Sequence, residues 1–119
     1  MAGRYVPERG EIVWLDFEPT RGKEIGKYRP ALVLSSRDYN RLTGLLICCP
    51  VSTSIRGAAT EVAVHNLDEP CVVAANLIHT LDWQSRKVKK AASAEAGVLE
   101  EVLARIIPLI GADRLLSAD

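Results

Sequence analysis

Short apolar segments, each bounded by residues that favour turns, fill the first two-thirds of the chain. Their length of four to seven residues and their content of Val, Ile and Leu favour β-strands over helices. The expected strands span residues 11–17, 30–35, 45–51, 61–65, 71–77 and 80–83. Turn-forming residues separate them, namely Pro19, Gly22, Gly26, Gly44, Gly57 and the stretch 66–70. Many short strands at close spacing predict a fold that is mainly β, a β-barrel.

The C-terminal part of the chain has a different, helical periodicity. Apolar residues recur there at intervals of three and four, namely Val98, Leu99, Val102, Leu103, Ile106, Leu109 and Ile110. We expect the helix to begin near Ala94, with Ser93 as its N-cap and Glu95 close to the positive end of the helix dipole. Pro108 should kink or end it, because proline lacks the backbone donor. The predicted fold is therefore a barrel with one amphipathic C-terminal helix.

The length and the cysteine content limit the class of protein. A chain of 119 residues suits one domain, residues 1–119, with one core. The three cysteines include the neighbours Cys48 and Cys49, unlike the even framework of small secreted proteins, so we expect a cytoplasmic protein. No segment resembles a signal peptide or a membrane span, and we expect no membrane association. The cysteines and histidines lack zinc-site spacing, and we predict no metal and no cofactor.

Two polar segments lie where a barrel has its loops. Lys plus Arg and Asp plus Glu both number 15, so any nucleic-acid site must be a local basic patch. The first segment, 16–35, contains Arg21, Lys23, Lys27 and Arg29 and could cover a phosphate backbone, or it could be a solvated hairpin loop. Arg29 precedes Pro30 at the start of a strand, where its guanidinium suits a phosphate or an ion pair with Glu24 or Asp16.

The second polar segment, 49–57, follows an apolar strand and contains Ser52, Thr53 and Arg56. Its hydroxyl groups could bind a phosphate oxygen, or they could cap their own turn. A basic run that includes Arg86 and Lys87 could guide an RNA backbone. Of the aromatic residues, Tyr28 suits a base, whereas Trp14 and Trp83 favour core or dimer contacts; His65 and His79 suit structural or surface positions.

The whole chain, in order, resembles the MazF/PemK family of toxins. Residues 9–24 resemble the first strand and loop of that family, 29–35 its second strand, and 39–44 the turn that follows. Pro50-Val51-Ser52-Thr53 falls at the family's Pro-x-Thr motif, and residues 76–83 resemble its later strand pair. The resemblance implies an SH3-like barrel that forms a homodimer, cleaves single-stranded RNA, including mRNA, without a metal, and inhibits translation. It also implies a MazE-like antitoxin and operator DNA binding only in complex with that antitoxin.

Matching positions in this family imply roles for individual residues. Arg29 and Ser52 match the catalytic arginine and threonine, and Glu24 matches the acidic loop residue, our candidate proton acceptor. Cleavage would proceed by attack of the 2′-hydroxyl and leave a cyclic phosphate and a free 5′-hydroxyl. The RNA-binding candidates come from both polar segments, the basic run and a strand end, where the Asn76 amide could read a base: Arg21, Lys23, Lys27, Tyr28, Thr53, Arg56, Asn76, Arg86 and Lys87. The basic run could equally bind an acidic antitoxin.

The chain departs from the family pattern at several positions. Ser52 replaces the usual threonine, which keeps the hydroxyl but removes the β-branch. Some PemK relatives use a loop histidine with an arginine and an aspartate, where this chain has Lys23, Ala74 and Asn76, so that mechanism does not apply. Two alternatives stay open. One is a catalytically weak SH3-like barrel that binds RNA or antitoxin, and the other is a gyrase-poisoning toxin with the same fold.

Overall fold

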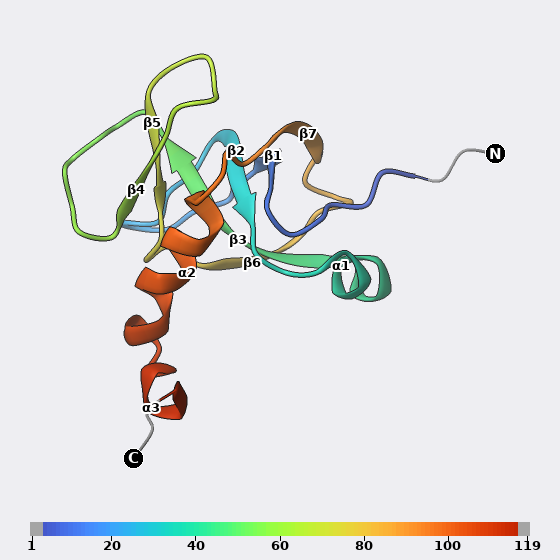
Figure 1. Cartoon of the computed structure of the whole chain (residues 1–119). Helices are drawn as coiled ribbons and strands as arrows, with labels where there is room; N and C mark the ends of the chain where they lie inside the picture. The colour runs from blue at the N-terminus through green and yellow to red at the C-terminus, as the bar shows by residue number, and fades with distance from the viewer. Residues whose placement is uncertain (1–3, 117–119) are drawn as a thin grey trace.

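The computed structural model describes residues 4–116, in which seven β-strands and three helices follow one another along the chain (Figure 1). The expected domain of residues 1–119 thus includes two short ends that lie outside the described residues. The strands are β1 (Glu11–Asp16), β2 (Tyr28–Val33), β3 (Leu45–Ser52), β4 (Glu61–Val64), β5 (Cys71–Ala74), β6 (His79–Asp82) and β7 (Lys89–Ser93). The helices are α1 (Arg37–Thr43), α2 (Val98–Leu109) and α3 (Asp113–Leu116).

The strands form one curled antiparallel sheet in the order β4-β5-β3-β2-β1-β7, and β6 pairs with β3 outside this path. Strand β3 is central because it pairs with β2, β5 and β6 along different parts of its length. The sheet curls into a half-barrel, with β4 and β7 at its two edges (Figure 1). The predicted barrel of short strands is therefore confirmed.

Two groups of buried side chains lie on opposite faces of the sheet, where one core was expected. Successive residues of a strand point to opposite faces, so the adjacent residues Cys48 and Cys49 belong to different groups. One group packs β2 to β5 against α2 and includes Leu32 and Val102. The other lies among β1, β2, β3 and β6 and includes Leu15. A sheet that buries both faces explains why its strands lack a simple apolar–polar alternation.

The C-terminal helix exists, but its predicted start was wrong. Helix α2 begins at Val98, after Gly97 with a φ of 90°, and Ser93 is the last residue of β7. Residues 89–93 pair with β1, for example Ala92 with Ile12, so that strand pairing prevails over the local capping signal. Pro108 lies in the last turn of α2, which ends one residue later, as expected.

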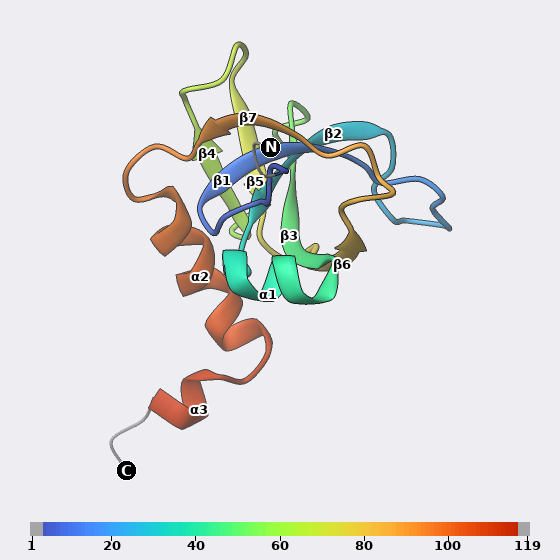
Figure 2. The same ribbon diagram turned by 90° about the vertical axis from the view of Figure 1, so that its right-hand side faces the viewer.

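Helix α1 was not predicted, because it is short and carries few apolar residues. Ser36 caps it by accepting a hydrogen bond from the N–H of Tyr39 at 3.2 Å. Gly44 ends it in the left-handed conformation, with a φ of 73°. Figure 2 shows α1 beneath the sheet, while α2 leads toward α3, which lies farther from the strands. Among the described residues, no helix is long and apolar enough to cross a membrane.

Candidate nucleic-acid interface and active site

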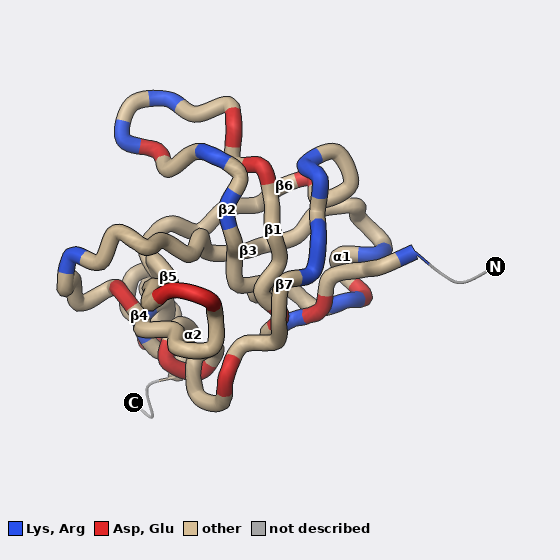
Figure 3. The backbone as a smooth tube through the Cα atoms, turned by 90° about the horizontal axis from the view of Figure 1, so that it is seen from above, with Lys and Arg blue, Asp and Glu red and all other residues tan. Residues whose placement is uncertain are grey.

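The loop between β1 and β2, residues 17–27, is braced by the basic run that precedes β7. The Nη1 atom of Arg86 donates hydrogen bonds to the carbonyl oxygens of Asp16 at 2.9 Å and Glu18 at 2.8 Å. The N–H of Asp16 in turn donates to the carbonyl of Arg86 at 3.0 Å. Figure 3 shows the basic positions of this loop beyond the ends of β1 and β2, and those of the basic run beside β1. Arg86 therefore supports the loop.

Arg29 is half-buried near the start of β2, where its backbone pairs with that of Leu15 on β1. Its Nε–H donates to the carbonyl oxygen of Gly26 at 2.6 Å. Burial lowers the pKa of its guanidinium, while the charge of Glu18 acts in the opposite direction. Among the described residues Arg29 has no ion pair, and neither Nη nitrogen donates to a protein acceptor. Its Nη donors are therefore available to a phosphate.

The sequence left open an ion pair between Arg29 and Glu24 or Asp16, and the structure shows neither. Oε1 of Glu24 instead accepts a hydrogen bond from the N–H of Arg21 at 2.7 Å, within the same exposed loop. The carboxylate of Glu24 thus stays exposed and retains acceptor sites for a substrate proton.

Ser52 is the last residue of β3 and is half-buried. The pairing of β2 with β3 ends at Ala31 and Pro50, and Arg29 and Ser52 each lie two positions farther along their strands. Because side chains alternate, both extend from the same face of the sheet as that last pair. The Oγ atom of Ser52 accepts the N–H of Ser54 at 3.0 Å, which leaves its own proton for another acceptor.

A groove of about 450 Å³, here called the loop groove, adjoins Ser52. It brings together five residues that the sequence singled out, namely Lys23, Glu24, Ser52, Arg56 and Asn76. They come from the β1–β2 loop, from the end of β3 and the loop that follows it, and from the segment between β5 and β6. The loop groove therefore combines positive charge, an amide, a hydroxyl and a carboxylate in one concave surface.

Glu61 also lines the loop groove, and sequence reasoning missed it. Its carboxylate accepts hydrogen bonds from the backbone N–H groups of Arg56, Gly57 and Ala58. These contacts hold the turn that carries Arg56. In the sequence, Gly57 predicted a turn at this place. No pattern identified Glu61 as the residue that holds this turn.

A second groove of about 460 Å³, the β7 groove, also adjoins Ser52. Thr53 lines it together with residues of β7 and of the turn between β4 and β5, among them Lys89, Lys90, Asp68 and Glu69. Ser52 is shared by both grooves. Five predicted RNA-binding residues and Arg29 line neither: Arg21, Lys27, Tyr28, Arg86 and Lys87.

The two tryptophans occupy different environments. Trp83 is buried, as expected for a core residue. Trp14 is half-buried, lines the β7 groove and stacks on Tyr28 with ring centroids 5.5 Å apart. The Tyr28 hydroxyl donates to the carbonyl of Lys87 at 3.0 Å. Tyr28 nevertheless remains 45% exposed. The pair forms an aromatic surface next to the basic run.

The histidines occupy structural and surface positions, as expected. His79 is half-buried and contacts the edge of Phe17, whereas His65 is exposed and pairs with Glu95 at 3.4 Å. Cys48, Cys49 and Cys71 are buried free thiols. Within residues 4–116, no cluster of three or more His, Cys, Asp or Glu could bind a metal.

The curled antiparallel sheet of short strands, which carries a basic loop and a strand-end hydroxyl, places the chain among small SH3-like barrels. The profile of one family of this class, described as "PemK-like, MazF-like toxin of type II toxin-antitoxin system", matches residues 8–110. The chain belongs to this family.

Individual relatives agree with this assignment. The chain is 36% identical over 111 residues to the endoribonuclease toxin MazF of Escherichia coli K12, a match that covers 93% of this chain and all of that one. It is 36% identical to the endoribonuclease toxin ChpB of the same organism, over 83% and 90% of the two chains. The crystal structure of MazF from Deinococcus radiodurans superposes with a TM-score of 0.87 and 44% identity, over 91% and 99%. A MazE–MazF complex from that organism superposes with a TM-score of 0.79 and 41% identity, over 91% of this chain and 98% of that one.

Proposed function

We propose that this chain is a type II toxin that cleaves single-stranded RNA, including mRNA, in the cytoplasm and thereby inhibits translation. Its 36% identical relatives are named endoribonuclease toxins. The observation that carries the proposal is the availability of the Arg29 Nη donors on the face of the sheet that also presents the Ser52 hydroxyl. A guanidinium and a hydroxyl placed in this way suit a phosphodiester.

The reaction needs a base, stabilisation of charge on the phosphoryl oxygens, and a proton for the leaving group. The 2′-oxygen forms a bond to phosphorus as the bond from phosphorus to the 5′-oxygen breaks, which leaves a cyclic phosphate and a 5′-hydroxyl. Glu24 accepts the proton of the 2′-hydroxyl from its exposed loop position. Arg29 and Ser52 donate hydrogen bonds to the phosphoryl oxygens. Burial lowers the pKa of Arg29, which is the direction that favours proton donation to the leaving oxygen.

The RNA strand would lie along the loop groove, where Lys23, Arg56 and Asn76 offer two charges and one amide. Thr53 would contact it from the β7 groove, and Tyr28 would stack on a base through its exposed ring. The remaining basic candidates are assigned to the phosphate backbone outside the grooves, with Arg86 also bracing the loop: Arg21, Lys27, Arg86 and Lys87.

Partners follow from the relatives. Crystal structures of MazE–MazF complexes at about 41% identity support a MazE-like antitoxin for this chain. We also assign it a homodimeric state, with operator DNA binding only in the complex with the antitoxin. An acidic antitoxin segment would compete with RNA for the basic surfaces.

Incubation of the purified protein with a long natural RNA in the presence of a chelator tests the activity. The wild type should cleave at defined positions, and Arg29→Ala should lose about 100-fold or more in rate, as with loss of a major charge-stabilising group. Arg41→Ala is the matched control, because Arg41 is an exposed arginine on α1 that lines neither groove. Equal degradation of the RNA by wild type and Arg29→Ala would overturn the proposal, since a contaminant would then account for it.

A further inference from the structure

One peptide unit of the β1–β2 loop connects the guanidinium of Arg29 to a carboxylate that sequence reasoning did not single out. The carbonyl of Gly26 accepts the Nε–H of Arg29 at 2.6 Å. The N–H of the same peptide unit, which belongs to Lys27, donates to Oε2 of Glu18 at 2.8 Å. The Gly26–Lys27 peptide is thus held at its N–H by Glu18 while its carbonyl holds the guanidinium.

Glu18 itself is anchored to the end of β1. Its N–H donates to Oδ1 of Asp16 at 3.0 Å, and its carbonyl oxygen accepts Nη1 of Arg86 at 2.8 Å. The N–H of the preceding residue, Phe17, donates to the carbonyl of Lys27 at 3.0 Å. Glu18 and the backbone that directly follows this peptide are therefore tied to the end of β1, although the loop surface is exposed.

Gly26 leaves room for the carboxylate of Glu18 in this arrangement. A Cβ atom at this position would lie much closer to Oε2 of Glu18 than real Cβ atoms approach another atom. The atom it would meet is the far end of a flexible side chain, so an added methyl group would displace the carboxylate more readily than the backbone. Lys27, the next residue, has a φ of 72°, a conformation that most side chains avoid.

Electrostatics agree with this geometry. Burial lowers the pKa of Arg29, and the negative charge of Glu18 is the neighbouring charge that opposes this effect. Glu24, the loop carboxylate that matches the family pattern, hydrogen-bonds the N–H of Arg21 instead. The two carboxylates of the loop thus have separate environments. Glu18 lies beside the peptide that holds Arg29, and Glu24 lines the loop groove.

We propose that Glu18 is a positioning residue for the RNA-cleavage reaction: through the Gly26–Lys27 peptide it holds Nε of Arg29, so that the two Nη nitrogens face the phosphate in one orientation. Gly26, whose carbonyl accepts the Nε–H of Arg29, directly follows Ile25 in the chain. Ile25 lines the loop groove together with Ser52. Glu18 does not contact RNA in this arrangement. The inference rests on the proposed function, because it assumes that Arg29 acts on the phosphate.

The test measures kcat and KM for cleavage of one short RNA that contains a mapped site, with thermal unfolding of each variant in parallel. Glu18→Ala should lower kcat by about 10- to 100-fold, because a misplacement of about 1 Å can cost this much in rate. KM should change less than about twofold, since the RNA contacts remain. Glu18→Gln keeps an oxygen that can accept the Lys27 N–H and should recover most of the lost kcat.

Gly26→Ala provides an independent way to displace the carboxylate, and it should lower kcat by a similar factor. The double variant, which combines Gly26→Ala with Glu18→Ala, should have a kcat within about twofold of that of the slower single variant. Both changes release the same peptide, so their effects should not add. Glu100→Gln is the matched control, since Glu100 is exposed on α2 and lines neither groove. It should behave as the wild type does.

Several results would overturn the inference. Wild-type kcat in Glu18→Ala would show that the carboxylate does not position Arg29, even where Arg29→Ala is inactive and the proposed function stands. A rise in KM at unchanged kcat would make Glu18 an RNA contact. A loss of thermal stability that parallels the loss of kcat, without recovery in Glu18→Gln, would make its role structural. Equal cleavage by Arg29→Ala and wild type would instead remove the proposed function itself.

Discussion

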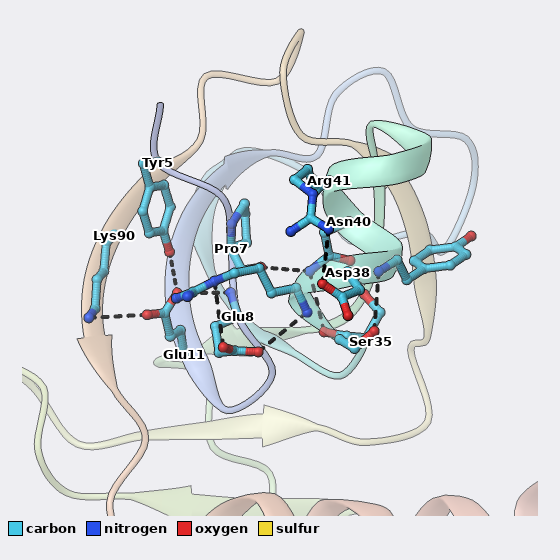
Figure 4. A network of polar contacts seen from close by, with 12 residues as sticks. Tyr5, Pro7, Glu8, Glu11, Ser35, Asp38, Asn40, Arg41 and Lys90 are labelled. Carbon is cyan, nitrogen blue, oxygen red and sulfur yellow. Dashed lines mark hydrogen bonds and ion pairs between the residues drawn. The ribbon is translucent and has the colours of Figure 1, made fainter. Parts of the chain in front are cut away.

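Asn40 on α1 is the most completely buried polar side chain with a defined set of partners, and its removal tests the packing argument. The side chain is fully buried, and its Nδ2 donates to the carbonyl oxygens of Pro7 at 2.8 Å and Ser35 at 3.3 Å. Its Oδ1 accepts the hydroxyl of Ser35. Its backbone carbonyl accepts the indole N–H of Trp83 at 3.0 Å. Asn40 therefore joins the N-terminal segment, the turn that follows β2, and α1 (Figure 4).

Asn40→Ala removes these side-chain bonds, so the carbonyls of Pro7 and Ser35 each lose a donor. The Ser35 hydroxyl still accepts the N–H of Ile47 at 2.8 Å but loses the acceptor of its own proton. Each buried group left unsatisfied costs about 1–3 kcal/mol. The small cavity adds to this cost, so we expect a loss of about 3–5 kcal/mol in the free energy of unfolding. For a chain of 119 residues, 1 kcal/mol corresponds to roughly 4 °C in Tm. The expected decrease in Tm is about 12–20 °C.

Urea unfolding followed by tryptophan fluorescence, together with calorimetry, measures this loss. Asp38→Ala is the control on the same helix, because Asp38 forms an exposed ion pair with Arg41 at 3.1 Å. It should change the free energy of unfolding by less than about 1 kcal/mol. An Asn40→Ala protein that unfolds within about 1 kcal/mol of the wild type would refute the reasoning that this network stabilises the fold.

Three further predictions concern the site and the pH dependence. Ser52→Ala should lower kcat for RNA by about 10²-fold while Ser52→Thr retains activity, because the hydroxyl donates to a phosphoryl oxygen; equal rates for Ser52→Ala and wild type would contradict this. Burial opposes ionisation of Glu11, but hydrogen bonds from Tyr5 and the backbone outweigh it and hold the pKa of Glu11 below its ordinary value. The carboxylate therefore stabilises the folded state above the pKa of the unfolded chain, and this contribution disappears as the pH falls through the lower folded pKa. Unfolding of Glu11→Gln should accordingly differ from wild type most at pH 7 and least in acid; a difference independent of pH would exclude this linkage. Burial raises the pKa of Cys49 to about 12 and that of Cys48 as well, so mass spectrometry should find both unmodified by iodoacetamide at pH 8 until the protein is unfolded.

Most strands could be predicted from the sequence, because short apolar segments between turn residues have few other ways to bury their side chains. Strand β7 was missed since its residues, Lys89–Ser93, combine two lysines with small side chains and form a strand only by pairing with β1. The same pairing displaced the predicted helix start, because it placed Ser93 at the end of that strand. Local patterns describe what a segment favours alone, and these errors arose where a distant segment decided otherwise.

The candidate site divides in the same way. The family motifs placed Arg29, Ser52 and Glu24, and the loop groove unites the last two. The sequence could not show whether Glu18 or Glu24 lies beside the peptide that holds Arg29, since both belong to the same loop. Backbone hydrogen bonds decide it, by holding Glu18 against the Gly26–Lys27 peptide and turning Glu24 toward Arg21.

The sequence by itself thus determined the kind of fold and the residue types available for phosphate chemistry, because apolar periodicity and motif order are local properties of the chain. Only the tertiary structure decided which of these residues meet. Curling of the sheet brings the β1–β2 and β3–β4 loops to one groove, and Arg86 fixes the first of them from 68 residues away. Such contacts depend on hydrogen bonds from a side chain to backbone groups far away in the chain, which leave no pattern in the neighbouring residues.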